Sequence, residues 1–241
     1  MSRRTLTPLA PRLKPPPERL YGRARGHKLR PRQELLLARA LERFSFPAAA
    51  AGAPAAAFGA PPAELWLEIG AGSFEHAEGF LAARPQAALI AAEVFENGLA
   101  SVLSRLVPEG AEETAAPPAR LRLWPGDGRK LLAILPDSAL AGLILMFPDP
   151  WPKARHARRR FVHPAALPEI ARVMRAGAEW RIASDDPTYH AWVAMVMGEQ
   201  AYFAPAAPAP ARPDGWPGTR YEAKALAAGR APLYWSFRRR G

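Results

Sequence analysis

Short apolar runs alternate with segments of helical periodicity along most of the chain. The runs are bounded by Gly, Pro or acidic residues, which is typical of buried strands. We predict strands of this kind at residues 64–70, 88–94, 121–124, 143–147 and 179–184. Between and around them, apolar residues recur every three or four positions, which predicts helices at residues 31–44, 74–83, 96–106, 164–175 and 188–197.

The end of the chain follows a different pattern. Residues 219–226 and 231–238 flank the turn-forming residues 227–229, and we predict that they form an antiparallel strand pair. Strands that alternate with helices form a mainly parallel, doubly wound sheet. We therefore predict an α/β fold in which residues 31–241 form a single domain, with a mainly parallel sheet that ends in this antiparallel pair.

The chain of 241 residues fits one α/β domain with a short additional segment. Lys and Arg total 33 against 22 Asp and Glu, a formal net charge of +11. This excess predicts a polyanionic partner, nucleic acid before membrane surface, although a GC-rich genome also raises the Arg content. Cysteine is absent, which excludes disulfides and thiolate metal sites and is compatible with a cytoplasmic location. We find neither a membrane-spanning stretch nor a secretory signal.

Residues 1–30 are basic and are interrupted by several prolines. Such a segment buries little apolar surface, so we expect a flexible N-terminal arm. Two interpretations fit this arm equally well: a disordered basic leader, or an arm that contacts RNA phosphates.

The strand at residues 143–147 ends in a loop that is locked by proline. Three prolines in the segment P-D-P-W-P fix φ and lack an N–H group, so neither a helix nor a central strand continues through it. The loop projects Asp149, Trp151 and Lys153 from the end of a strand, where ligands bind in open α/β sheets. A run of cations follows the loop: Arg155, Arg158, Arg159 and Arg160. These side chains form either a solvated helix face or a surface that binds RNA phosphates.

Three successive strand ends carry groups that suit a nucleotide-like cofactor. Gly70 and Gly72 form a turn between a strand and a helix, where the backbone can approach a ligand closely. Glu93 ends the next strand at the spacing of a carboxylate that binds ribose hydroxyls. Asp127 ends the third strand, where a carboxylate is able to accept a hydrogen bond from an adenine amino group. The set is a stronger signal than any one of its members.

Two cofactors fit this arrangement, NAD and S-adenosylmethionine. The pattern G-x-G-x-x-G lacks its third glycine at Glu75, and the pattern E-x-G-x-G-x-G lacks it at Phe74. The second pattern begins at Glu68, whose carboxylate suits the cationic amine of S-adenosylmethionine. Phe74 either turns away from the pocket or reshapes it, and the affinity for the cofactor depends on which of the two occurs.

The run F-P-D-P-W-P-K-x-R-H-x-x-R-R, together with T-R-Y-E near the C-terminus, resembles the signature of bacterial tRNA (guanine-N7)-methyltransferases. The resemblance covers the chain from about residue 65 to residue 237. It implies a Rossmann-like class I methyltransferase fold. It also implies transfer of a methyl group from S-adenosylmethionine to N7 of a variable-loop guanosine in tRNA.

Methylation of N7 needs no general base, because N7 carries no proton. The product purine is cationic, and a nearby carboxylate stabilises the developing charge. Asp149 is the first candidate for this role and is also a candidate for cofactor binding, and Asp185 is the second candidate. The remaining substrate-binding residues that the resemblance implies are Lys153, Thr219, Arg220, Tyr221 and Glu222.

Two alternatives remain open. One is a non-catalytic RNA-binding relative that binds the cofactor poorly because Phe74 replaces a loop glycine. The other is an NAD-dependent dehydrogenase, which would leave the basic cluster unused. With tRNA as the partner we expect no metal and no membrane partner, and the sequence does not distinguish a monomer from a homodimer.

Overall fold

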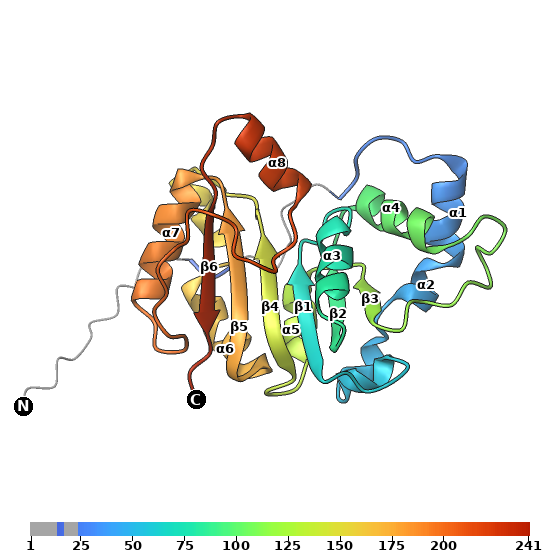
Figure 1. Cartoon of the computed structure of the whole chain (residues 1–241), viewed down its shortest axis with the longest axis horizontal. Coiled ribbons are helices and arrows are strands. Elements are labelled where there is room, and N and C mark those ends of the chain that lie inside the picture. The colour runs from blue at the N-terminus through green and yellow to red at the C-terminus, as the bar shows by residue number, and fades with distance from the viewer. Residues whose placement is uncertain (1–13, 17–23) are drawn as a thin grey trace, which may run out of the picture.

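The computed structural model describes residues 14–16 and 24–241. Within these ranges the chain forms a six-stranded sheet with helices on both faces (Figure 1). The strands are β1 (Glu64–Ile69), β2 (Ala87–Ala92), β3 (Leu121–Trp124), β4 (Leu140–Met146), β5 (Met174–Ser184) and β6 (Leu233–Arg238). The α-helices are α1 (Pro31–Arg39), α2 (Leu41–Phe44), α3 (Glu75–Ala83), α4 (Glu96–Leu106), α5 (Gly128–Ile134), α6 (Leu167–Val173), α7 (Pro187–Gly198) and α8 (Arg220–Ala227). The 3₁₀ helices are η1 (Ala48–Ala50), η2 (Pro54–Ala57), η3 (Ala154–Arg159) and η4 (Pro164–Ala166).

The strand order is β3-β2-β1-β4-β5-β6. The first five strands are parallel to their neighbours, and β6 pairs antiparallel with β5. This order confirms the predicted fold class, a mainly parallel doubly wound sheet that ends in an antiparallel pair, although the partner of the last strand is β5 and not the predicted strand at residues 219–226. The chain order reverses between β1 and β4, and ligands bind outside the carboxyl ends of the strands at such a switch point.

Both faces of the sheet are buried, which is why the strands are apolar almost throughout. One core cluster lies under α1, α3 and α4, and the other lies under α5, α6 and α7. Within the first cluster the ring of Trp66 packs on β4, because Gly142 has no side chain there. A Cβ atom on Gly142 would lie 2.2 Å from that ring. The packing fixes β1 against β4, the two strands that form the switch point.

The prediction of a strand at residues 219–226 is wrong. These residues form α8, which Figure 1 shows above the ends of the central strands. Thr219 and Glu222 make a capping box: the Thr219 hydroxyl accepts from the Glu222 N–H at 2.9 Å, and the Glu222 carboxylate accepts from the Thr219 N–H at 3.3 Å. The sequence T-x-x-E is the signature of this motif, and it outweighs the polar–apolar alternation.

Two further elements differ from the prediction. Helix α5 follows β3 directly, although the sequence pattern gave no helix there. Strand β5 begins at Met174, within the end of the predicted helix, so that it is longer than the predicted strand. The longer strand pairs with β4 as early as Leu140.

Part of the N-terminal segment is docked rather than extended into solvent. The predicted flexible arm lies outside the described residues at positions 1–13 and 17–23. Residues 24–27 lie against the start of α4, where Gly26 N–H donates to Asn97 Oδ1 at 2.7 Å and Arg25 pairs with Glu96 at 3.0 Å. A Cβ atom on Gly26 would lie 2.7 Å from the ring of Phe95, so this contact requires glycine.

Candidate active site

A cavity of about 370 Å³ lies at the switch point, at the carboxyl ends of the parallel strands. Its volume falls in the range of pockets for small ligands and cofactors. It is lined by glycines of the turn after β1, by residues that follow β2, β3 and β4, and by one ring from α8. The lining includes Gly70, Gly72, Glu93, Phe95, Asp127, Arg129, Asp149, Trp151, Arg159 and Tyr221. The structure therefore brings together the groups that the sequence placed at separate strand ends.

The turn after β1 has a backbone that only glycine adopts easily. Gly70 and Gly72 have φ of 73° and 59°, in the left-handed region that side chains disfavour. Helix α4 supports the turn closely, because a Cβ atom on Gly98 would lie 2.0 Å from the carbonyl oxygen of Gly72. The turn thus presents bare backbone to the cavity and rests on a second glycine in α4.

Phe74 occupies the position of the missing third glycine. Its φ of 68° lies in the left-handed region. This conformation costs a non-glycine residue about 1–2 kcal/mol, so glycine would be adopted more easily at this position. The side chain is completely buried in the core cluster under α1, α3 and α4 and is not part of the cavity lining. Of the two outcomes that the sequence left open, Phe74 turns away from the pocket.

The Glu93 carboxylate holds the backbone of two loops. One oxygen accepts from Gly72 N–H at 2.6 Å, and the other accepts from Val94 N–H at 2.7 Å and from Phe95 N–H at 2.9 Å. Burial raises the pKa of Glu93 above the usual 4.5, and the hydrogen bonds only partly oppose this effect. The carboxylate lies in the cavity wall at the end of β2, the position expected of a group that binds ribose hydroxyls.

Asp127 caps the first turn of α5. Its carboxylate accepts from Arg129 N–H at 2.9 Å and pairs with the Arg129 guanidinium at 2.7 Å. Both residues line the cavity at the end of β3. Arg129 was not among the predicted site residues, although an Asp followed by a helix-forming run is a recognisable N-cap signal.

The proline-locked loop after β4 carries backbone strain. Phe147 and Trp151 have φ of 50° and 44° without being glycine, and such residues concentrate at functional sites. Asp149 lies between them and is exposed along the cavity. The surrounding protein nevertheless removes part of its hydration, because burial raises the pKa of Asp149 above the usual 3.8.

The cations that follow the loop divide into two groups. Lys153 and Arg155 are exposed and Arg158 is half-buried, so all three remain candidates for RNA phosphates. The guanidinium of Arg159 stacks 4.8 Å from the ring centre of Trp151, and both side chains line the cavity. His156 contacts the edge of the same ring, and its burial together with the neighbouring cations, Arg159 first, lowers its pKa.

The predicted phosphate contact is not supported for Arg160, which is buried. Its Nε donates to the Pro150 carbonyl and its Nη2 to the Trp151 carbonyl, both at 2.9 Å. The guanidinium also lies 4.5 Å from the ring centre of Trp192. Arg160 therefore holds the proline loop through two of its carbonyls, and its burial leaves little of the guanidinium accessible at the surface.

Helix α8 contributes one aromatic ring to the cavity wall. Tyr221 is half-exposed and lines the cavity, with its ring 3.8 Å from where a Cβ atom on Gly72 would lie. Glu222 is buried, and besides its capping role it accepts from Tyr234 Oη at 2.7 Å and pairs with Arg212 at 3.0 Å. These contacts occupy the carboxylate that the sequence offered for a guanine edge. Arg220 is exposed and pairs with Glu75 at 3.3 Å.

Asp185 follows β5, one strand away from Asp149. Its carboxylate pairs with Arg230 at 2.5 Å and is not part of the cavity lining. Within the described ranges, no group of three or more His, Cys, Asp or Glu is placed to hold a metal ion. The part of the chain that the structure describes also has no helix long and apolar enough to cross a membrane.

Comparison with solved structures supports the fold. The chain is similar to the 16S rRNA methyltransferase KamB, with a TM-score of 0.52, 16% identity, and coverage of 75% of this chain and 89% of that one. It is also similar to an antibiotic-related methyltransferase, with a TM-score of 0.51, 11% identity, and coverage of 73% and 87%.

Comparison with sequences is more specific. Residues 62–233 match the model of a family described as "Putative methyltransferase". A tRNA (guanine-N(7)-)-methyltransferase of Granulibacter bethesdensis is 57% identical over 229 residues, which cover 95% of this chain and 98% of the relative. The enzyme of the same name from Rhodospirillum rubrum is 43% identical over 92% of this chain and 88% of the relative. The chain therefore belongs to the family of bacterial tRNA (guanine-N7)-methyltransferases.

Proposed function

We propose that this protein transfers a methyl group from S-adenosylmethionine to N7 of a variable-loop guanosine in tRNA. The observation that carries the proposal is the single cavity wall in which Glu93, Asp127 and Asp149 meet at three strand ends. The names of the relatives supply the substrate, and a tRNA substrate makes the cytoplasm the expected location. The same cavity lies beside the exposed cations that follow β4.

The residues around the cavity fit S-adenosylmethionine. The glycine turn offers the close backbone approach that a nucleoside needs. Glu93 is available to ribose hydroxyls, and Asp127 lies at the end of β3 on the side expected for adenine. Glu68 is buried, and its Oε2 atom has no hydrogen-bond partner among the described residues. An unpaired buried carboxylate oxygen suits a cationic amine.

When bound, S-adenosylmethionine supplies an electrophilic methyl group. Guanine N7 carries a lone pair and no proton, so no side chain has to act as a base. The purine gains positive charge during methylation, and the Asp149 carboxylate lies in the cavity wall where it can stabilise that charge. The surrounding protein removes part of the hydration of Asp149, and a partly desolvated carboxylate stabilises a nearby cation more strongly than a fully solvated one does.

The exposed cations of η3 and the preceding loop are the proposed tRNA-binding surface. Lys153, Arg155 and Arg158 are the members exposed or half-exposed to solvent. Arg159 stacks on Trp151 at the edge of the cavity, so its charge lies between this surface and the site of methylation. Such a surface binds phosphates with an affinity that falls steeply with salt.

The alternative of a non-catalytic relative rested on Phe74. The buried position of that ring removes the physical reason for a blocked pocket. The relatives do not support a dehydrogenase, because both relatives described above are named methyltransferases.

The test is transfer of isotope-labelled methyl groups to purified tRNA, followed by nucleoside analysis. We expect label in 7-methylguanosine with the wild-type protein. Asp149→Asn should lower the rate about 10²–10³-fold, the loss seen when one preorganised electrostatic contact is removed. Asp214→Asn is the matched control, because Asp214 is exposed and lies outside the cavity lining. A wild-type rate retained by Asp149→Asn contradicts the proposed role.

A further inference from the structure

A buried acid–imidazole pair lies behind the glycine turn. His76, on the first turn of α3, bonds through Nδ1 to Glu68 Oε1 on β1 at 2.8 Å. Glu68 is 1% exposed and His76 is 5% exposed. With Glu68 as a carboxylate, which only accepts hydrogen bonds, Nδ1 is the donor of this bond. The bond fixes the orientation of the Glu68 carboxylate at the end of β1.

The outer atoms of both side chains lack hydrogen-bond partners among the described residues. They are Glu68 Oε2 and His76 Nε2, and both are buried. A buried carboxylate oxygen without a partner is strongly unfavourable, because it has lost its hydration without gaining a donor. A ligand that carries a positively charged donor would satisfy it.

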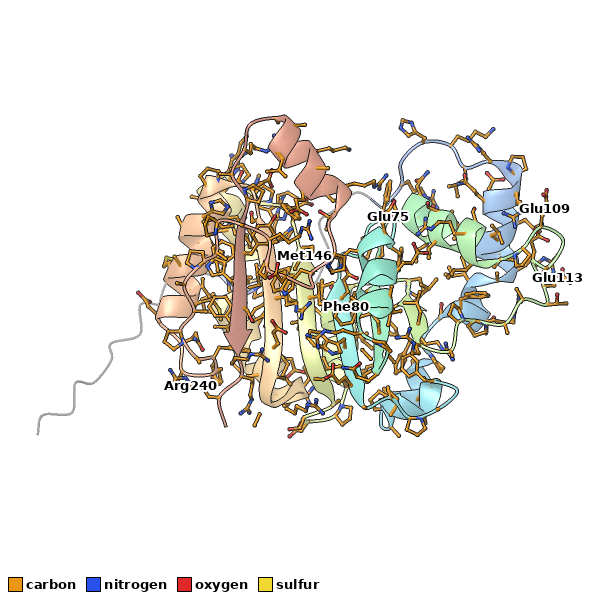
Figure 2. The ribbon with its side chains drawn as sticks, in the orientation of Figure 1. Glu75, Phe80, Glu109, Glu113, Met146 and Arg240 are labelled. Atoms are coloured by element: carbon orange, nitrogen blue, oxygen red, sulfur yellow. The ribbon has the colours of Figure 1, made fainter. Side chains whose placement is uncertain are left out.

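The pair lines a recess that adjoins the main cavity. The recess has a volume of about 20 Å³ and shares Gly70, Met146 and Tyr221 with the cavity wall. Figure 2 labels two of the residues that line the recess, Glu75 at the start of α3 and the shared Met146 at the end of β4. A space of this size holds one ammonium group or one water molecule.

The lining of the recess also includes a cation, Arg220, which is itself paired. Arg220 lines it from the start of α8, pairs with Glu75 and contacts the Ser73 hydroxyl. Glu75 lines the recess as well and already pairs with this guanidinium, so the unpaired Glu68 Oε2 is the group left for a cation. The recess thus fits an ammonium group that enters from the adjoining main cavity.

We propose that His76 is a positioning residue for the amino-acid end of the cofactor. It holds Glu68 Oε1, so that Oε2 faces the recess and accepts a hydrogen bond from the α-ammonium group. This inference rests on the proposed function, since it takes S-adenosylmethionine as the occupant of the cavity. It adds a role for an α3 side chain that does not line the main cavity.

Binding of two product-like probes, measured by titration calorimetry without tRNA, tests the inference. S-adenosylhomocysteine carries the amino-acid end, whereas methylthioadenosine lacks it. We expect His76→Leu to weaken S-adenosylhomocysteine about tenfold or more, the effect of one hydrogen bond to a charged group, and to change methylthioadenosine less than about twofold. His76→Asn keeps a donor near the position of Nδ1 and should recover most of the lost affinity.

Glu68→Gln provides an independent variant if His76→Leu does not fold. It keeps an oxygen for His76 but removes the charge, so it should also weaken S-adenosylhomocysteine selectively. Equal losses for both probes, or no loss for S-adenosylhomocysteine in either variant, would overturn the inference. If the wild-type protein binds neither probe, the proposed function fails with it. If the wild type binds both and the variants are unchanged, only the role of His76 fails.

Discussion

The burial of Arg160 makes a prediction that separates a structural arginine from an RNA-binding one. Arg160→Met removes two hydrogen bonds of 2.9 Å to the carbonyls of Pro150 and Trp151, and a contact with the Trp192 ring at 4.5 Å. Methionine replaces the aliphatic part of the arginine side chain and supplies no hydrogen-bond donor. The variant also loses the hydrogen bond that holds the carbonyl of Trp151, a residue with a strained, positive φ.

The size of the effect follows from these contacts. Each hydrogen bond from a charged donor contributes about 1.5–3 kcal/mol, and the ring contact contributes about 0.5–2 kcal/mol. The cost of burying the guanidinium offsets part of this sum, so we expect a net loss of about 3 kcal/mol. A domain of this size loses about 2–4 °C in Tm for each kcal/mol, which predicts a Tm lower by about 6–12 °C.

Two measurements with a matched control test this reasoning. Arg155→Met changes an exposed arginine of the neighbouring 3₁₀ helix and should alter stability by less than about 0.5 kcal/mol. In tRNA titrations at several salt concentrations, Arg155→Met should reduce the slope of log K against log salt by about 0.7–0.9, whereas Arg160→Met leaves it unchanged. An unchanged Tm together with a reduced slope for Arg160→Met would refute the structural role.

Three other predictions follow from single contacts in the site. The pKa of Glu93 is raised above 4.5 in the folded protein, so its contribution to the free energy of unfolding is present in acid and is lost as the pH rises through that pKa. Glu93→Gln should therefore flatten this part of a plot of the free energy of urea unfolding against pH. Binding of S-adenosylhomocysteine should show the opposite trend and weaken as Glu93 becomes protonated. Gly98→Ala should weaken the same ligand at least about tenfold in calorimetry, because the added methyl group displaces the carbonyl of Gly72. Gly26→Ala should increase proteolysis of the segment at residues 24–28 while leaving Tm within about 2 °C, since the change affects a docked surface segment.

The sequence predicted all six strands of the sheet, together with one at residues 219–226 that the structure does not contain, and it placed the candidate site at the strand ends. Apolar runs such as the one in β4 are long and uninterrupted because both faces of the sheet are covered, so their pattern is strong. The groups that follow these strands meet for a topological reason, since parallel strands all end at one edge. Glu93 and Asp149 could therefore be assigned to one cavity before any distance was known.

The errors have local causes. Residues 219–226 alternate like an edge strand, yet Thr219 and Glu222 form a capping box whose hydrogen bonds start a helix. Helix α5 is short, and its N-cap at Asp127 was read only as a binding group. In both places a capping signal of a few residues carried more information than the periodicity of the longer segment.

Tertiary contacts decide the remaining differences. The direction of the Phe74 side chain follows from its left-handed backbone, and the sequence gives no value for φ. The burial of Arg160 depends on Trp192, which lies on α7 and is distant in sequence. An arginine in a basic run is usually exposed. The basic run around Arg160 therefore predicts an exposed side chain, whereas the structure buries it.

The central claim is that the strand-end cavity directs a methyl group to N7 of guanine. A tRNA transcript in which 7-deazaguanosine replaces the variable-loop guanosine tests it most directly, because this base has a carbon in place of N7. Methyl transfer from labelled S-adenosylmethionine should reach the unmodified transcript and fail with the substituted one, although both transcripts bind with similar affinity. Label incorporated equally into the two transcripts would contradict the account.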